Sequence, residues 1–280
     1  MLITGSASEV RKQVEQKKSK GKTVGFVPTM GALHKGHISL VEQCKNECDY
    51  TIASIFVNPT QFNDKNDYNR YPRVPEHDTK MLEQAQCDLV FMPTEQEVYP
   101  ETDTRIFDFS PLDKVMEGVF RPGHFNGVAQ VVSRLFELVK PNKAFFGQKD
   151  FQQLAIIRRL ICQRAYPITI VGCGIVREND GLAMSSRNAL LNPQQRQAAP
   201  IIYQALLKAQ KQAKELTISQ IKQYVAEQIN INDELETEYA EVVDAVNLQP
   251  INNWDTASSA QLCVAVQVGK IRLIDNISLR

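Results

Sequence analysis

Two histidines, His34 and His37, are the residues whose type and spacing most directly suggest chemistry. They are three positions apart, so on the first turn of a helix they lie on one face. Imidazole N–H groups can donate hydrogen bonds to phosphoryl oxygens, where negative charge must be stabilised as it shifts. A pair of surface histidines at a helix cap is the alternative interpretation. However, the chain has only four histidines, and two of them fall in this turn.

The residues around the histidines predict a strand, a turn and a helix. Residues 23–27 form an apolar, β-branched run of strand length, and the apolar positions of residues 38–45 suit a helix. Gly31 and Gly36 allow positive φ or a close approach to a ligand. A helix that begins near Lys35 turns its unpaired N–H groups toward the turn. The pattern therefore predicts a phosphate-binding helix N-terminus.

Length and composition fit a globular α/β protein. The 280 residues suffice for one large domain and a smaller one, and 43% are hydrophobic. Basic and acidic residues balance at 32 each, so composition makes no case for nucleic acid or an anionic membrane as partner. Polar residues follow the first residues too early for a secretory signal. No apolar run reaches the length of about 18 residues that a membrane-spanning helix needs. We expect a cytoplasmic protein.

The cysteines predict neither a disulfide framework nor a zinc site. The six are scattered through apolar segments with no C-x-x-C pair. This pattern is typical of reduced, buried thiols.

A second polar segment follows the next strand. Residues 50–57 are nearly continuously apolar, as expected for a parallel strand covered on both faces. Asn58 and Gln61 come directly after it and carry amides that can donate and accept. Because parallel sheets bind ligands beyond the carboxyl ends of their strands, we expect this segment and the histidine turn to meet at one crevice. A simple polar turn is the alternative.

Three later segments offer neutral or cationic donors. Residues 121–127 form a glycine-rich loop before a helix, which fits either an anion-binding lid or a tight turn with a cap. Lys149 follows a further strand, and Gln153 lies one helical turn on. Residues 184–187 place two hydroxyls and a guanidinium in a loop suited to phosphate oxygens. These segments offer neither the paired carboxylates of a hydrolase nor a Ser/His/Asp set. A separate carboxylate, Asp78, falls on a helix that we expect to be exposed, and we therefore expect it to be solvated.

Weaker patterns predict the remaining strands, helices and loops. Residues 64–75 suggest a long polar loop, 89–93 a third strand and 105–109 a short edge strand. Two helices are expected within residues 193–230. Short strands then follow at 239–243, 262–266 and 271–275, with Gly269 turning the last two into a hairpin.

Five motifs in this order resemble the pantothenate synthetase (pantoate–β-alanine ligase) family. They are PTMGALHKGH (28–37), FVNPTQF (56–62), RPGHF (121–125), FGQKD (146–150) and MSSRN (184–188). The H-x-G-H turn is similar to the signature of the nucleotidyltransferase superfamily, which includes class I aminoacyl-tRNA synthetases. The resemblance covers about residues 21–195, and the rest matches only by position and length.

The resemblance implies a fold and a reaction. The fold is a Rossmann-like α/β domain, a parallel sheet with helices on both faces, over residues 1–176. A smaller C-terminal α+β domain over residues 177–280 covers ATP as a hinged lid. The implied reaction condenses pantoate with β-alanine through a pantoyl adenylate, using ATP with Mg²⁺ bound through the ATP phosphates, and releases AMP and pyrophosphate. Both nucleophiles belong to the substrates. A homodimer is also implied, with no nucleic acid, membrane or protein-bound metal.

The resemblance also implies site residues at matching positions. The ATP site would comprise Met30, Gly31, Ala32, Leu33, His34, Lys35, Gly36, His37, Gly147, Gln148, Lys149, Asp150, Val176, Met184, Ser185, Ser186 and Arg187. Gln61, Gln153 and Asn58 would contact pantoate or β-alanine. The catalytic group would be His37 as proton donor, with His34, Lys149 and Arg187 on the phosphates.

Two positions depart from the family pattern. Met184 stands where the family often has Leu, a volume-conserving change. Lys35 stands where an acidic residue is common and adds a cation near phosphate.

Two other functions stay open at this point. An adenylyltransferase shares the H-x-G-H turn but does not account for the NPTQF segment. A non-catalytic nucleotide-binding module would bind ATP without turnover. A dinucleotide oxidoreductase is disfavoured because no G-x-G-x-x-G turn follows the first strand.

Overall fold

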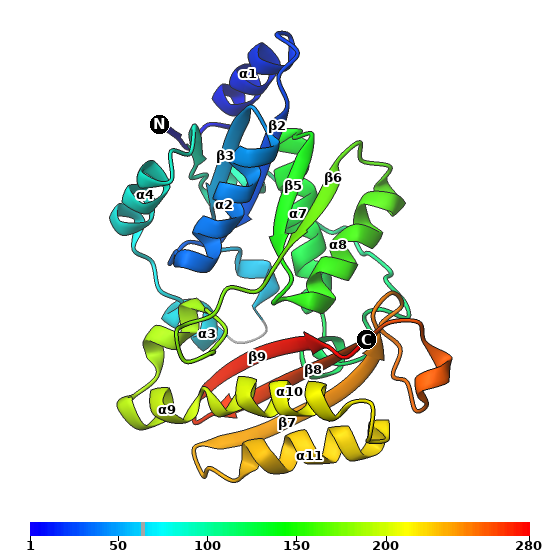
Figure 1. Cartoon of the computed structure of the whole chain (residues 1–280). Helices are drawn as coiled ribbons and strands as arrows, with labels where there is room; N and C mark the ends of the chain where they lie inside the picture. Colours follow the sequence, from blue (N-terminus) through cyan, green and yellow to red (C-terminus); the bar gives the residue numbers. More distant parts are fainter. Residues whose placement is uncertain (63–64) are drawn as a thin grey trace. The chain divides into compact units, whose positions relative to one another are not determined.

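The fold is described for residues 1–62 and 65–280 in a computed structural model (Figure 1). Asn63 and Asp64, where the predicted polar loop begins, lie outside the described residues. The described chain divides into two compact units. Unit 1 comprises Met1–Phe109, Arg121–Gln148 and Gln153–Gly174, and unit 2 comprises Ser110–Phe120, Lys149–Gln152 and Ile175–Arg280.

Unit 1 is built on a parallel sheet that has six strands in the described part of the chain. Its strands are β1 (Leu2–Thr4), β2 (Val24–Thr29), β3 (Tyr50–Ile55), β4 (Leu89–Phe91), β5 (Lys143–Gly147) and β6 (Thr169–Cys173). Their order is β1-β4-β3-β2-β5-β6. β2 pairs in parallel with β3 on one side and with β5 on the other.

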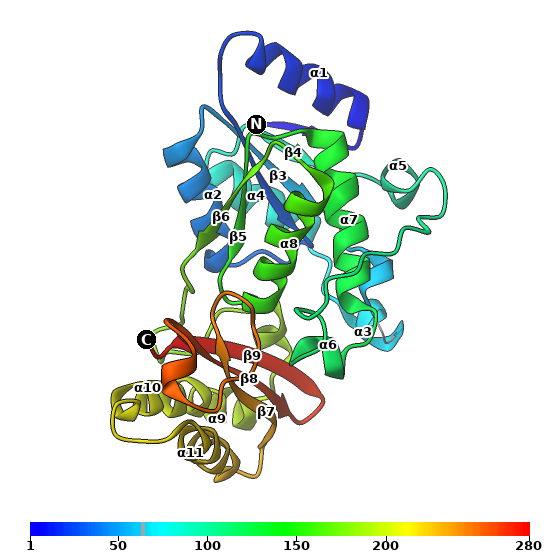
Figure 2. The ribbon, with the colours of Figure 1, turned by 90° about the vertical axis from the view of Figure 1, so that its right-hand side faces the viewer.

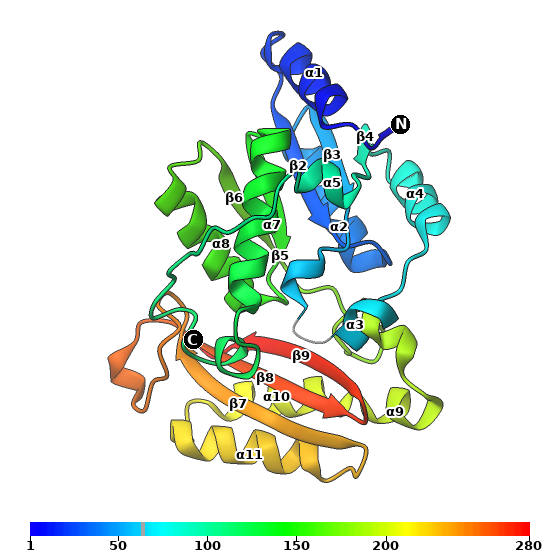
Figure 3. The same cartoon turned by 180° about the vertical axis from the view of Figure 1, so that it is seen from behind.

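Helices cover both faces of this sheet. They are α1 (Ala7–Lys18), α2 (Lys35–Glu47), α3 (Lys65–Arg70), α4 (Pro75–Gln84), α5 (Glu95–Val98), α7 (His124–Val139), most of α8 (Phe151–Arg164) and the 3₁₀ turn η1 (Pro59–Gln61). α2 and α4 lie on one face, and α7 and α8 on the other (Figure 2). From behind, α7 stands in front of the sheet (Figure 3). The predicted Rossmann-like parallel sheet is confirmed.

Sequence pattern explains how these elements form. Every residue of β3 except Ile55 is buried, which matches the nearly continuous apolar run expected of a strand covered on both faces. In α2, Leu40, Val41 and Cys44 are buried at helical spacing and pack against the sheet. The sheet core is thus continuous beneath the helix that carries the histidines.

The strand order also defines where ligands bind in such sheets. The chain proceeds from β2 to β3 and β4 in one direction, and from β5 to β6 in the other. Open parallel sheets bind ligands at this topological switch point, beyond the carboxyl ends of the strands. Here the switch point lies between β2 and β5, and Met30 and Gln148 are the residues that follow those strands.

Unit 2 is an antiparallel sheet with helices packed against it. Its elements are α6 (Glu117–Phe120), η2 (Ser186–Leu190), α9 (Pro193–Ala198), α10 (Ile201–Gln212), α11 (Ile218–Asn230), β7 (Leu235–Asp244), η3 (Trp254–Thr256), β8 (Ala260–Val268) and β9 (Ile271–Ser278). The strand order is β7-β8-β9, and α10 and α11 pack against this sheet through one apolar core (Figure 1). The predicted smaller α+β part is confirmed, whereas the boundary at residue 176 stays a prediction.

Several element predictions were wrong. Residues 2–4 form a strand that the sequence analysis missed, and residues 65–70 form a helix within the expected loop. Within the described residues 193–230 there are three helices instead of two, because Pro200 separates α9 from α10. Residues 105–109 do not form a strand.

The cysteine prediction holds in part. All six cysteines lie in the described ranges and are free thiols, of which Cys44, Cys87, Cys173 and Cys263 are buried. Cys162 is exposed and Cys48 is half-buried, contrary to the expectation.

Among the described residues, no helix is long and apolar enough to cross a bilayer.

Candidate active site

The turn after β2 carries both histidines, and its shape depends on Gly31. Gly31 has φ +78°, a left-handed value that glycine adopts without steric cost. A β-carbon here would lie 2.9 Å from Asp78 Oδ2 and 3.1 Å from Ile55 Cγ2. The Gly31 N–H donates to Thr29 Oγ1 at 3.2 Å, and the Thr29 hydroxyl donates to the Ser54 carbonyl at 2.7 Å. The turn is therefore fixed against the end of β3.

Asp78 holds the next two residues of the turn, so the prediction that it is solvated was wrong. The residue is 1% exposed. Its Oδ2 accepts from the Ala32 N–H at 2.9 Å, and its Oδ1 accepts from the Leu33 N–H at 2.7 Å. Ala32 has φ 48°, so these charge-assisted hydrogen bonds hold a non-glycine residue in the left-handed region. An acid in the first turn of a helix beginning at Pro75 is equally typical of a solvated residue, so sequence alone did not single it out.

The two histidines cap the helix that they begin. His34 Nδ1 accepts from the Gly36 N–H at 3.1 Å, and His37 Nδ1 accepts from the His34 N–H at 3.3 Å. Their ring centroids are 4.0 Å apart. Since each Nδ1 is an acceptor, this hydrogen-bond pattern assigns both rings the neutral tautomer with the proton on Nε2. The pair therefore carries two neutral Nε2–H donors.

This capping corrects the physical reason behind the predicted phosphate site. The sequence analysis attributed phosphate binding to unpaired N–H groups at the start of α2. The N–H groups of His34 and Gly36 are instead satisfied by imidazoles, and those of Ala32 and Leu33 by Asp78. Side chains thus satisfy four N–H groups of this turn, which leaves fewer backbone donors for an anion than the sequence pattern predicted. Lys35, an exposed residue at the first position of α2, adds a cation to the same turn.

Gln61 lies beside the turn, as the sequence analysis expected. Its Nε2 donates to Met30 Sδ at 2.9 Å, and its Oε1 accepts from Asn58 Nδ2 at 3.3 Å. The two polar segments thus meet at the carboxyl edge of β2 and β3. Gln61 is half-buried, whereas Asn58 is 1% exposed.

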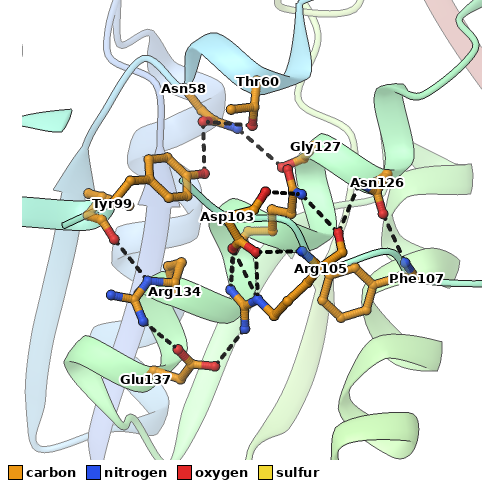
Figure 4. Close-up of polar contacts among 12 residues, drawn as sticks. Asn58, Thr60, Tyr99, Asp103, Arg105, Phe107, Asn126, Gly127, Arg134 and Glu137 are labelled. Carbon is orange, nitrogen blue, oxygen red and sulfur yellow. Dashed lines mark hydrogen bonds and ion pairs between the residues drawn. The ribbon is translucent and has the colours of Figure 1, made fainter. Parts of the chain in front are cut away.

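Asn58 is engaged inside the protein (Figure 4). Its Oδ1 accepts from the Tyr99 hydroxyl at 3.0 Å and from the Thr60 hydroxyl at 3.2 Å, and its Nδ2 donates to the Gly127 carbonyl at 3.2 Å. Burial raises the pKa of Tyr99 to about 12, so its phenol stays protonated as a donor. These contacts give Asn58 a positioning role toward Gln61, and direct contact with pantoate stays a prediction.

An ionic network lies next to Asn58 and includes the residues expected as an edge strand (Figure 4). Arg105 pairs with Asp103 at 2.5 Å and with Glu137 at 2.9 Å. The Phe107 N–H donates to Asn126 Oδ1, and Gln130 Nε2 donates to the carbonyls of residues 103 and 105. Side chains of α7 thus take the backbone groups that a neighbouring strand would have satisfied, which explains why no strand forms.

The loop of residues 121–127 leads into α7 and contacts the Gln61 segment. Gly123 has φ 81° and caps α7 without a side-chain hydrogen bond. His124 is 6% exposed, and its Nδ1 lies 2.9 Å from the Gln61 carbonyl oxygen. Sequence reasoning left this loop as a lid or a capped turn and did not foresee that it touches Gln61. The available signal was the position of a histidine at the start of an apolar helix.

The predicted residues after β5 divide between the two units. In unit 1, Gly147 ends β5, and the N–H of Gln148 donates to the Cys173 carbonyl at 2.8 Å. Gln153, also in unit 1, is half-buried in the first turn of α8. Its neighbour Gln152 belongs to unit 2, where it is buried and donates to the carbonyls of residues 112 and 115.

In unit 2, β9 anchors the predicted ATP-binding segments. Asn276 Nδ2 donates to the Lys149 carbonyl at 2.8 Å. Arg177 donates from both terminal nitrogens to Asp275, at 2.6 and 3.0 Å, and its guanidinium carbon lies 3.7 Å from the centre of the Tyr203 ring. Burial raises the pKa of Asp275, although Arg177 opposes that shift.

The Arg177 anchor fixes a short hairpin. The Met184 N–H donates to the Val176 carbonyl at 3.0 Å, and Arg177 bridges to Ala183. Ser185 then caps η2 by accepting from the Arg187 N–H at 3.3 Å. Within unit 2, β9 thus ties together the segments of residues 149–150 and 176–187. The sequence signal was an adjacent polar pair, Asp275 and Asn276, within the strand Ile271–Ser278.

The side chains of Lys149 and Asp150 were also predicted to serve ATP. Lys149 Nζ lies 3.7 Å from Asp150 Oδ1, and the Lys149 side chain is 20% exposed. The cation is partly covered yet accessible. Among residues 1–62 and 65–280, no group of three or more His, Cys, Asp or Glu residues is arranged to hold a metal ion.

In unit 1, an H-x-G-H turn with paired imidazole donors lies at the switch point of a parallel sheet. This combination defines the class of α/β nucleotide-binding proteins that carry the H-x-G-H signature. Comparisons with known proteins narrow the class. The family described as pantoate-beta-alanine ligase matches residues 2–278. The chain belongs to this pantoate–β-alanine ligase family.

Individual relatives agree with the family match along the whole chain. A pantothenate synthetase from Porphyromonas gingivalis is 50% identical over 99% of each chain. The crystal structure of pantothenate synthetase from Thermus thermophilus has a TM-score of 0.93 and 41% identity, covering 100% of this chain and 99% of that one. A pantoate-beta-alanine ligase from Francisella tularensis, complexed with beta-gamma ATP and beta-alanine, has a TM-score of 0.83 and 34% identity, covering 100% and 98%.

Proposed function

We propose that the chain condenses pantoate with β-alanine to form pantothenate at the expense of ATP. In the first half-reaction, a pantoate carboxylate oxygen attacks the α-phosphorus of ATP, and pyrophosphate leaves. In the second, the β-alanine amine attacks the acyl carbon of the pantoyl adenylate, AMP leaves and the amine gives up a proton. The full-length family match supports this reaction.

The paired histidine caps are the observation that carries the residue-level proposal. Because both Nδ1 atoms accept backbone N–H groups, both Nε2–H groups act as neutral donors. Such donors stabilise negative charge that grows on the phosphates as pyrophosphate leaves. We assign the predicted donor role to His37 as a hydrogen bond from its neutral Nε2–H, which keeps its proton while it stabilises the phosphate charge, with His34 beside it. The protein needs no nucleophile of its own, because both nucleophiles come from substrates.

The other predicted residues complete the proposal. Gln61, supported by Asn58, and Gln153 contact pantoate or β-alanine through their amides. Lys149 and Arg187 contact ATP phosphates as cations, Val176 contributes its backbone, and Mg²⁺ is held by the ATP phosphates. The remaining ATP contacts come from residues 30–37, 147–150 and 184–187. A homodimer, a cytoplasmic location and a lid role for residues 177–280 are further proposals drawn from the family resemblance.

Product analysis tests the reaction. The purified chain is given ATP, Mg²⁺ and pantoate with and without β-alanine, and AMP, pyrophosphate and pantothenate are quantified. We expect sustained AMP release only with all substrates present. Pantoate alone should support exchange of labelled pyrophosphate into ATP. Pyrophosphate release without AMP would indicate an adenylyltransferase, and ATP binding without any product would indicate a binding module.

A further inference from the structure

The predicted pantoate ligand Gln61 sits on a very short element. The turn η1 spans only Pro59–Gln61 and has no side-chain cap at its first residue. A single helical turn has little stability of its own, so its position must come from its neighbours. The element packed against it is the first turn of α7.

Contacts of different kinds hold η1 on α7. Asn58 Nδ2 donates to the Gly127 carbonyl at 3.2 Å. A β-carbon on Gly127 would lie 2.8 Å from Gln61 Cα and from the Thr60 carbonyl carbon, so only glycine permits this approach. A further hydrogen bond involves the Gln61 backbone itself, through His124.

The ring of His124 has its tautomer fixed by its partners. Arg121 Nη1 lies 3.0 Å from His124 Nε2. A guanidinium can only donate, so Nε2 is the acceptor and the proton of the neutral ring is on Nδ1. His124 Nδ1–H therefore donates to the Gln61 carbonyl oxygen at 2.9 Å. At 6% exposure the ring cannot exchange this partner for bulk water.

We propose that His124 is a positioning residue for pantoate, acting through the backbone of Gln61. This inference rests on the proposed role of Gln61. The hydrogen bond fixes the Gln61 carbonyl, and the Gln61 amide is then set between Met30 Sδ and Asn58 Nδ2. Loss of the bond frees the segment that carries the amide, while the histidine turn keeps its own support from Asp78.

Paired substitutions at His124 separate its two nitrogens. Asparagine places an N–H donor near the position of Nδ1, whereas glutamine places its amide near Nε2. We expect His124→Ala and His124→Gln to raise the KM for pantoate about three- to ten-fold, the effect of one lost hydrogen bond. His124→Asn should restore most of the loss. The KM for ATP should stay near the wild-type value in all three, measured by pantoate-dependent pyrophosphate exchange.

Two controls make the result decisive. Ser133→Ala removes a fully buried hydroxyl of the same helix. This hydroxyl has no hydrogen-bond partner among the described residues, so the substitution should change neither KM. Gln61→Ala should raise the pantoate KM more than His124→Ala does.

Each alternative result has one meaning. An unchanged pantoate KM in His124→Ala, with an effect in Gln61→Ala, overturns the role of His124 alone. An unchanged KM in Gln61→Ala overturns the proposed role of Gln61 instead. Equal rises of the KM values for pantoate and ATP show that His124 serves the general fold. Failure of His124→Asn to recover the pantoate KM in a protein of wild-type thermal stability contradicts the role assigned to the Nδ1–H donor.

Discussion

At the scale of single residues, the central feature is the use of each imidazole for two purposes. Nδ1 of His34 and of His37 closes the N-terminus of α2, and this bond sets the tautomer that leaves a proton on Nε2. A proton on either Nδ1 would replace an acceptor with a donor and break a cap. Helix stability and donor chemistry are therefore linked in the same two rings.

Substitutions at His37 should separate these two purposes. His37→Ala should lower the adenylation rate about 10²- to 10⁴-fold, the range for a positioned acid or charge stabiliser. His37→Asn offers an amide oxygen near the position of Nδ1 but no donor near Nε2. We expect it to recover thermal stability while the rate stays low. Stopped-flow adenylation and thermal unfolding measure the two effects, and near-normal turnover in either variant would remove His37 from the mechanism.

Asp78 gives a second prediction at this scale. Asp78→Asn replaces one acceptor oxygen with a donor that faces a backbone N–H, so we expect a destabilisation of about 1–3 kcal/mol. The distorted turn should also raise the KM for ATP. Glu76→Gln is the matched control, because Glu76 is an exposed acid on the same helix. Equal denaturation midpoints and equal KM values for the two variants would contradict the role assigned to Asp78.

Sequence revealed some of these residues and not others. His34, His37 and Gln61 belong to compact motifs whose residue types suggest chemistry locally. Asp78 and His124 act through partners 45 and 63 positions away in the sequence, and their own neighbourhoods are ordinary helix starts. A role defined by a distant backbone group leaves no local pattern.

At the scale of elements, α7 does more than cover the sheet. Its polar side chains bind the backbone of residues 103–107, and its first turn supports η1. The strands β2 and β3 were predictable because their apolar runs reflect burial on both faces. The alternation at residues 105–109 resembled a strand because the segment is extended, but its partners are amides on a helix.

The ionic network beneath α7 predicts a pH-dependent stability. The hydrogen bond from Arg105 holds the pKa of Asp103 below its ordinary value of 3.8. A lowered carboxyl pKa adds stability that is full above about 3.8 and disappears as pH falls through the lower, folded-state value. Asp103→Asn should therefore cost about 1–3 kcal/mol at pH 7 and progressively less below pH 3.8.

Denaturant unfolding at several pH values measures this difference. Glu101→Gln removes an equal charge from an exposed residue of the same segment and should leave the pH dependence unchanged. A stability difference for Asp103→Asn that is constant from pH 7 to pH 3 would contradict the prediction.

At the scale of the whole molecule, the chain enters unit 2 before unit 1 is finished. Residues 110–120 and 149–152 belong to unit 2 although unit 1 continues to Gly174. Glu117 accepts from two nitrogens of Arg272, at 2.6 and 2.7 Å, and Arg272 also pairs with Glu238. The division into residues 1–176 and 177–280 stays a prediction; it treats domains as contiguous, because sequence gives no sign that a short internal segment belongs elsewhere.

Removal of Arg272 should selectively destabilise the segment of residues 110–120. Arg272→Met leaves two nearly buried carboxylates without their cation, which costs about 3–5 kcal/mol for a broken buried pair. We expect faster hydrogen–deuterium exchange in residues 110–120 and in β7 and β9, with unchanged exchange in β2, β3 and β5. Lys222→Met, which breaks a half-exposed pair with Glu241, is the control and should have little effect. Uniformly faster exchange would contradict this assignment.

The placement of these partners late in the chain has a consequence for synthesis on the ribosome. The sheet of unit 1 can form once residue 174 has emerged. The partners of Lys149 and Glu117, however, are synthesised 127 and 155 residues after them. At roughly 5–20 residues per second, that delay lasts on the order of ten seconds. During it, the nascent chain presents the parallel sheet of unit 1 and two segments that bond to each other through Gln152 but still lack their partners on β9. Synthesis of β9 supplies both partners at once.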